Sequence, residues 1–276
     1  MLEQLKYVNH LGEVIEFGKK GTFANSNDLR DYEWTYDSSR NRAENFRKGV
    51  VSKTIPIVIS AANKKKCTDI KNRLYEVCEK DIIAEKKGRL YIGDYYLECY
   101  VFSSAKSNYL DVATSMNLSL KVVTDGGRWM KEELHNYKHV PDKFIEGKGY
   151  EYCYEYDYNS ISDNISKLEV DDFRNCDFVL SIHSGAVNPV IYVDNHYYSV
   201  RCVVGDGDKI VINSAELTIT LVKADGTQEN MFRYRDKQSD VFEKISPGNH
   251  RVMWNGSFDF DLSVIHERGE PKWTWT

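Results

Sequence analysis

The sequence predicts a mainly β protein with one packed helix, divided into two domains. Three observations lead to this fold class. Phe, Trp and Tyr make up 13% of the residues while Pro occurs only 5 times, and aromatic side chains favour strands. Apolar and polar residues alternate in many short runs that are separated by turn residues. The length of 276 residues suits two ordinary domains, each with a core that needs no disulfide.

The charge distribution supports a division into residues 1–137 and 138–276. The whole chain carries a net charge of −5, but the first part has a net charge of +3 and the second of −8. Residues 139–148 contain a proline and a glycine without apolar periodicity, which is typical of a linker. We therefore expect the domain boundary there.

The first domain begins with a predicted hairpin and two further strands. Residues 2–8 and 14–17 flank a turn, and residues 31–37 and 54–60 each alternate with the period of a strand. Pro56 lies inside the last of these runs. Because proline cannot donate a ladder hydrogen bond, it predicts an edge strand.

Alternation in the 31–37 run places three aromatic residues on one face and mostly acidic residues on the other. The aromatic residues are Tyr32, Trp34 and Tyr36. If several copies of the chain assemble, this aromatic face could supply part of the contact, so these residues are a candidate subunit interface.

One helix is predicted at about residues 64–84. Its apolar residues recur at intervals of three and four, which gives a single buried stripe and predicts that the helix lies on a sheet. The stripe consists of Cys67, Ile70, Leu74, Val77, Cys78 and Ile82. Asn63 is a suitable N-cap, and Gly88 suits the exit from the helix. Strands are expected to follow at 89–92, 95–102 and 113–123.

The sequence pattern of the second domain predicts strands almost throughout. Eight short runs separated by turns predict a β-sandwich of jelly-roll type. They span residues 178–183, 190–193, 197–204, 209–213, 216–223, 230–234, 250–254 and 258–266.

Sequence signatures of catalysis and of cofactor binding are absent. There is no P-loop, no G-x-S-x-G elbow and no Rossmann glycine run, so no cofactor is expected. The six cysteines form no C-x-x-C pair and are predicted to be buried free thiols. His135 and His139 have the spacing of helical zinc ligands, but Pro141 and the missing glutamate favour a solvated linker.

Asp259 and Asp261 are the best candidates for catalytic residues. On one strand they would share a face at a separation of roughly 6–7 Å, which would allow glycoside hydrolysis. A polar outer face opposite Phe258, Phe260 and Leu262 accounts for the same pattern without catalysis. We expect the polar face and no enzyme.

Exposed aromatic residues in the second domain suggest a carbohydrate-binding module as the alternative function. Tyr152, Tyr154 and Tyr156 alternate with acidic residues and could stack on sugar or contact a partner protein. Trp254 is the second candidate for such a contact. Burial of the tyrosines against a neighbouring domain or subunit is the favoured explanation of this pattern.

Short segments along nearly the whole chain resemble the distal tail proteins of long-tailed phages that infect Gram-positive bacteria. Each segment is short, and the resemblance rests on their order and spacing. They are residues 5–9, 12–13, 17–18, 31–34, 55–57, 88–91, 93–95, 177–178, 185–189, 197–200, 210–214, 228–232, 245–249 and 254–256, and the ending Glu267-Arg268-Gly269-Glu270-Pro271-Lys272-Trp273.

This resemblance implies a structural role in the virion. The first domain would be a β-sandwich-like belt that forms a ring, usually of six copies, and the second a galectin-like sandwich. Such a ring joins the tail tube protein to the tail-tip protein and, in some phages, to receptor-binding proteins or cell-wall glycan. Genome DNA would pass through without specific binding, which the mildly acidic composition permits.

The composition also limits where the protein acts. No stretch approaches 18 consecutive apolar residues, so we expect no membrane-spanning helix. The first residues lack the pattern of a secretory signal. Both features fit a protein made in the bacterial cytoplasm and built into the phage tail tip.

Overall fold

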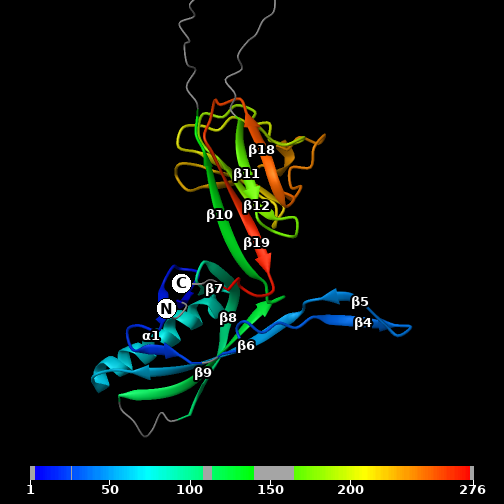
Figure 1. Cartoon of the computed structure of the whole chain (residues 1–276). Coiled ribbons are helices and arrows are strands. Elements are labelled where there is room, and N and C mark those ends of the chain that lie inside the picture. Colours follow the sequence, from blue (N-terminus) through cyan, green and yellow to red (C-terminus); the bar gives the residue numbers. More distant parts are fainter. Residues whose placement is uncertain (1–3, 26, 108–113, 140–164, 274–276) are drawn as a thin grey trace, which may run out of the picture. The chain divides into compact units, whose positions relative to one another are not determined.

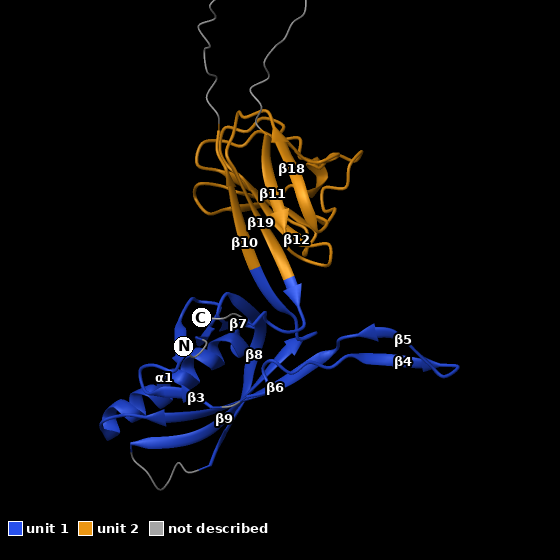
Figure 2. Ribbon diagram, in the orientation of Figure 1, with its two compact units in different colours: residues 1–131, 267–276 blue, residues 132–266 orange. Residues whose placement is uncertain are grey.

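The computed structural model describes residues 4–25, 27–107, 114–139 and 165–273, and it is mainly β (Figure 1). The chain forms two compact units (Figure 2). Unit 1 contains residues 1–131 and 267–276, and unit 2 contains residues 132–266. The final ten residues thus group with unit 1, whereas the sequence-based division placed them in the second domain. Among the described residues, no helix has the length and apolarity that a membrane crossing requires.

Unit 1 is built on two groups of antiparallel strands that share β8. β1 pairs with β2 and β7, β7 pairs with β8, and β8 continues onto β9, which pairs with β6. The strands are β1 (Leu5–Val8), β2 (Val14–Phe17), β3 (Thr22–Ala24), β4 (Thr35–Ser39), β5 (Arg42–Arg47), β6 (Val50–Ser60), β7 (Gly88–Ile92), β8 (Tyr95–Lys106) and β9 (Ser115–Asp125). Inward-facing residues of these strands other than β4 and β5, together with one face of the helix α1 (Lys64–Ile83), form the core.

The predicted helix is confirmed, but its buried face differs from the prediction near the C-terminal end. Cys67, Leu74, Val77 and Cys78 are buried as expected from the helical period. Ile82, however, is 41% exposed. Asp81 is buried in its place, because residues of the β1–β2 hairpin hold its carboxylate.

The Asp81 carboxylate is the polar centre of this contact. It accepts hydrogen bonds from the Tyr7 hydroxyl and, at 2.9 Å, from the backbone N–H of His10. Burial, and then the bond to Asp81, raise the pKa of Tyr7 above its usual value, so the hydroxyl stays protonated and remains a donor. Gly88 lies directly against this pair.

The N-terminal cap of α1 provides a first test of the local structure. The Asn63 side chain accepts the Lys66 N–H at 2.9 Å. Asn63→Ala removes this acceptor and should lower the free energy of unfolding by about 1 kcal/mol in urea titrations. Asn72→Ala, at an exposed position inside the helix, is the matched control and should not destabilise the protein. Equal losses in the two variants would contradict the role of the cap.

β6 is not the edge strand that Pro56 predicted. It pairs with β9 along its whole length, and its last residues also pair with β3. The Pro56 carbonyl accepts the Asn25 N–H at 2.9 Å, just beyond the end of β3. The nitrogen and carbonyl of one strand residue point to the same side, so the missing N–H faces that end and not β9.

Unit 2 is a sandwich of two antiparallel sheets around a separate core. One sheet has the order β17-β16-β15-β12-β19-β10 and the other β11-β18-β13-β14. The elements are β10 (Trp129–Tyr137), β11 (Ile165–Val170), β12 (Asp177–Ile182), β13 (Val190–Val193), β14 (His196–Ser199), β15 (Lys209–Asn213), β16 (Thr218–Val222), β17 (Gln228–Asn230), the 3₁₀ helix η1 (Phe232–Tyr234), β18 (Gly248–Trp254) and β19 (Phe260–Arg268). The strand predicted at 230–234 is therefore mostly the η1 turn.

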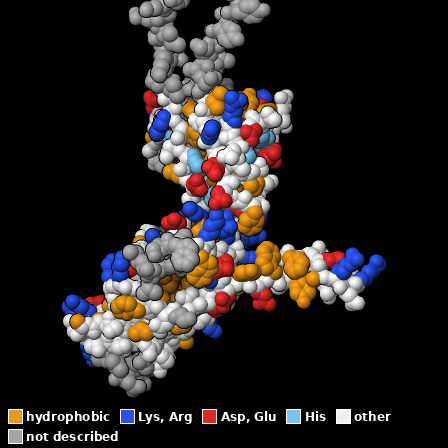
Figure 3. Space-filling model, in the orientation of Figure 1, with side chains coloured by type: hydrophobic (Ala, Val, Ile, Leu, Met, Phe, Trp, Pro, Cys, Tyr) orange, Lys and Arg blue, Asp and Glu red, His pale blue; other side chains and the backbone are white. Residues whose placement is uncertain are grey.

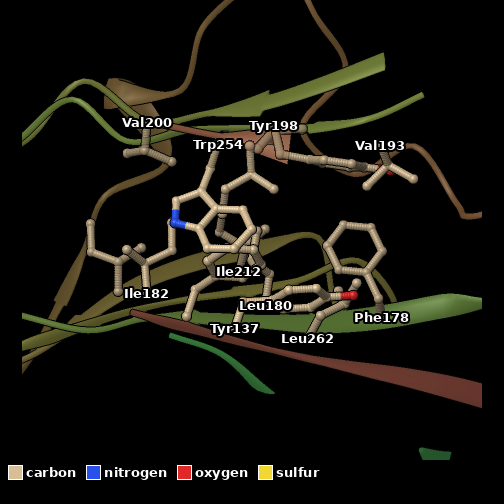
Figure 4. Packing of buried hydrophobic residues seen from close by; sticks show 14 of the residues in the cluster. Tyr137, Phe178, Leu180, Ile182, Val193, Tyr198, Val200, Ile212, Trp254 and Leu262 are labelled. Carbon is tan, nitrogen blue, oxygen red and sulfur yellow. The ribbon is translucent and has the colours of Figure 1, made fainter. Parts of the chain in front are cut away.

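Aromatic side chains fill the middle of this core (Figure 4). The ring of Tyr137 stacks on Phe260 at 4.5 Å, and Trp254 meets Phe260 edge-on at 5.2 Å. The Trp254 Nε1–H donates to the Phe258 carbonyl at 3.2 Å. Burial raises the pKa of Tyr137 to about 12, so this phenol is uncharged at neutral pH.

Candidate functional site

The strands β4 and β5 form a hairpin that pairs with no other described strand of unit 1. Its turn residues Arg40 and Asn41 both have positive φ, as a two-residue hairpin of type I′ requires. Asn45 also has positive φ, close to a register shift in the pairing. In Figure 1 the hairpin extends away from the other strands of unit 1.

Large apolar side chains are exposed along this hairpin and beside it. Tyr36 and Phe46 are each 58% exposed, and their ring centroids lie 5.8 Å apart across the two strands. Tyr32, Trp34 and Val50 are also exposed. These five residues are called the aromatic hairpin surface below. Figure 3 shows hydrophobic side chains along the hairpin and basic side chains at its tip.

The predicted aromatic strand is shorter than the alternation suggested. β4 begins at Thr35, so Tyr32 and Trp34 precede it and only Tyr36 lies within it. The buried ammonium of Lys53 explains this, because it donates to the backbone carbonyls of Asp28 and Asp31 and so holds that segment as a loop. Burial lowers the pKa of Lys53, while the two aspartates oppose that shift.

The end of the chain fastens the same loop. The Arg30 guanidinium donates to the Pro271 carbonyl at 2.7 Å and lies over the Trp273 ring at 3.8 Å. Trp273 in turn donates through Nε1 to Glu270 at 2.8 Å. The arginine–acid–proline–tryptophan ending of the sequence therefore has a structural role at the base of the aromatic hairpin surface.

The hairpin does not bury its apolar side chains within unit 1. Every residue of β5 is exposed, and β4 is exposed except for one half-buried residue. A two-stranded hairpin is only marginally stable in water, and contiguous exposed apolar side chains mark contact surfaces. The geometry therefore suits burial against another protein chain.

Two hollows also lie on the surface of unit 1. One of about 530 Å³ has charged side chains in its wall, where Lys87 is paired to Asp125 and Arg128 to Glu267. The other, of about 610 Å³, lies between α1 and strands β8 and β9 and is mainly apolar. Neither hollow holds an arrangement of groups for acid–base chemistry.

The other residues selected from the sequence do not form one site. Tyr152, Tyr154 and Tyr156 lie outside the described residues. Trp254 is 9% exposed and packs in the core of unit 2, so its proposed contact with sugar or a partner is wrong. Trp254 lies in a strand in which buried and less buried residues alternate, and it has the phase of the buried ones.

The paired aspartates have separate partners. Asp259 accepts the backbone N–H of His139, and this bond, followed by Lys138, lowers the pKa of Asp259. Asp261 lies 2.7 Å from His183 Nε2. A glycosidase acid needs a raised pKa, which Asp259 does not have. His135 lies in the strand β10, so it belongs neither to the solvated linker that the sequence favoured nor to a helix with zinc-ligand spacing.

Residues that the sequence did not single out do form a cluster of potential metal ligands. Asp172, Cys176 and His266 come together in unit 2. The five described cysteines are free thiols, and four of them, Cys67, Cys78, Cys99 and Cys176, are buried as predicted, whereas Cys202 is only partly buried.

Solved structures of phage tail components share the fold of this chain over almost its full length. A chain of the phage P2 baseplate, in the structure of its activated conformation with Ca, matches with a TM-score of 0.64 at 12% identity. The match covers 98% of this chain and 100% of that one. The crystal structure of the SPP1 Dit protein, described as a paradigm of the hub adsorption apparatus in phages infecting Gram-positive bacteria, matches with a TM-score of 0.55 at 6% identity.

The second match covers 96% of this chain and 99% of the SPP1 protein. At these identities the likeness is one of fold, and the predicted resemblance to distal tail proteins is confirmed at that level. No protein-family model matches the sequence, and no curated protein matches it.

Proposed function

We propose that the protein is a structural component of a phage tail, a distal tail hub whose copies associate into a hexameric ring. The observation that carries the proposal is the aromatic hairpin surface, which extends from unit 1 without a core of its own. The fold shared with a baseplate chain and a hub protein supports this role. The proposal assigns no catalytic residue and no cofactor.

In this proposal unit 1 forms the ring and unit 2 forms the outer sandwich. The hairpin of one copy contacts a different surface of the next copy, which is the heterologous contact that closes a ring. Tyr32, Trp34 and Tyr36, with Phe46, are the residues of the contact. Burial of these rings between copies would remove four exposed aromatic side chains from water.

The ring would connect the tail tube protein on one side with the tail-tip protein on the other. Receptor-binding protein or cell-wall glycan would bind through the outer sandwich. Genome DNA would pass through the ring, and the net charge of only +3 on residues 1–137 permits passage without strong retention. The protein would be made in the bacterial cytoplasm and act in the virion.

The solution mass of the purified protein tests the ring directly. We expect light scattering over a concentration series to show a species of about six subunits. Because the proposed contact is mainly apolar, the ring should persist when the salt concentration is raised from low to moderate. A chain that stays monomeric at every concentration, with and without purified tail tube protein, would contradict the proposal.

A further inference from the structure

Three side chains that differ chemically meet inside unit 2. Asp172 and Cys176 lie in the segment between β11 and β12, and His266 lies near the end of β19. The His266 Nδ1 atom is 3.0 Å from Asp172 Oδ2 and 3.9 Å from Cys176 Sγ. All three potential ligand atoms lie within 4.8 Å of one another.

The three side chains are buried and held in place. The side chain of Asp172 is 1% exposed, and Cys176 and His266 are also buried. The backbone of Cys176 exchanges two hydrogen bonds with Ile245, at 2.7 and 3.0 Å, which fix the position of its thiol. Burying a carboxylate and an imidazole is costly unless they are paired or coordinate a metal.

A second carboxylate faces the other ring nitrogen of His266. Glu133 Oε2 lies 3.4 Å from His266 Nε2. Histidine ligands of metals almost always donate their second N–H to such a group, which fixes the tautomer and leaves the first nitrogen free to coordinate. His135 is on the same face of β10 as Glu133, and its buried Nε2 atom makes no hydrogen bond.

The spacing is close to that of a tetrahedral metal site. With bond lengths of about 2.3 Å to sulfur and about 2.0 Å to nitrogen or oxygen, neighbouring ligands are roughly 3.3–3.6 Å apart. The observed 3.0 and 3.9 Å deviate from this range by only a few tenths of an ångström. A thiolate with an imidazole selects zinc-like ions over calcium or magnesium, which prefer oxygen ligands.

We propose that Asp172, Cys176 and His266 bind one zinc-class divalent ion, with Glu133 orienting His266. On binding, the thiol releases its proton to solvent and the sulfur forms the bond to the metal. A water molecule completes the four ligands. The ion fastens the β11–β12 segment to β19, which is a structural role. This site is independent of the proposed hub function.

Cobalt provides the direct test, because a bond between a thiolate and Co²⁺ gives a charge-transfer band in the near ultraviolet. Tag-free full-length protein, kept reduced with a phosphine, is titrated with Co²⁺. We expect the band to saturate at one ion per chain, and added Zn²⁺ to displace it. Cys176→Ala should lose the band. Cys202→Ala, which removes a partly buried thiol outside the cluster, should keep it.

Thermal unfolding of the wild-type protein is a second test, and it does not require that any variant fold correctly. Removal of metal with a chelator should lower the melting temperature, Zn²⁺ should restore it, and Ca²⁺ should not. Absence of the band and of the Zn²⁺ effect in the wild type would overturn the proposal and leave an ion-paired histidine between two carboxylates. A band that persists in Cys176→Ala would overturn it as well.

Discussion

The triple variant Trp34→Ala, Tyr36→Ala and Phe46→Ala is expected to be a folded monomer under conditions in which the wild-type protein forms a ring. Each aromatic side chain buried at the centre of an interface contributes about 2 kcal/mol or more, which corresponds to roughly 30-fold in affinity. Loss of three such side chains from every contact should therefore abolish the ring at micromolar concentration.

The fold itself should tolerate these substitutions. The three side chains are exposed in the isolated chain, and surface substitutions typically change the free energy of unfolding by no more than about 0.5 kcal/mol each. The melting temperature and the circular dichroism spectrum should therefore match those of the wild type. Light scattering measures the loss of the ring under the same conditions.

A matched control uses exposed apolar side chains of unit 2. The double variant Leu134→Ala and Tyr234→Ala removes side chains of similar exposure and should keep the ring. If the triple variant still assembles, the aromatic hairpin surface is not the subunit contact. If the control also loses the ring, the contact is not confined to the hairpin.

Gly88→Ala is expected to destabilise unit 1 strongly. A methyl group at this position would overlap both the Tyr7 hydroxyl and the Asp81 carboxylate. Either β1 or the last turn of α1 must then move, which breaks the buried hydrogen bond between the two side chains.

The expected loss in the free energy of unfolding is roughly 2–6 kcal/mol. Overpacking contributes about 1–3 kcal/mol, and a buried acceptor without its donor about 1–3 kcal/mol. Urea titration followed by circular dichroism measures the change. Gly49→Ala is the control, because no atom lies within 4 Å of the added methyl group and its backbone is not in the positive-φ region.

Tyr7→Phe separates the two contributions to the Gly88 effect. It removes the donor to Asp81 without adding volume and should cost about 1–3 kcal/mol. A Gly88→Ala protein as stable as Gly49→Ala would show that Asp81 is not held as described.

Local sequence patterns were sufficient to predict those elements whose structure depends on one hydrophobic period. The period of three and four from Cys67 to Cys78 predicted the helix, since only one face of it could be buried. Asn63 predicted its start through a contact with the next turn. The alternating runs of the second domain predicted a two-sheet sandwich, because alternation defines an inner and an outer face.

The tertiary structure decided which polar residues are buried and which aromatic residues are exposed. Lys53 is buried because it binds carbonyls of a loop that precedes it by more than 20 residues, and the resulting loop shortened the predicted aromatic strand. Trp254 is of a residue type common in sugar-binding sites, yet it packs on Tyr137, which is far from it in the sequence, and on Phe260 of the other sheet.

The metal-ligand cluster likewise depends on the tertiary structure and not on a local sequence pattern. Asp172 and Cys176 are close in the sequence, but His266 is 90 residues beyond Cys176, and no short motif connects them. Pairing of β12 with β19 brings the two regions together. The sequence by itself determined the periodic elements, whose information is local. Only the tertiary structure determined the sites, since their distances depend on which strands pair.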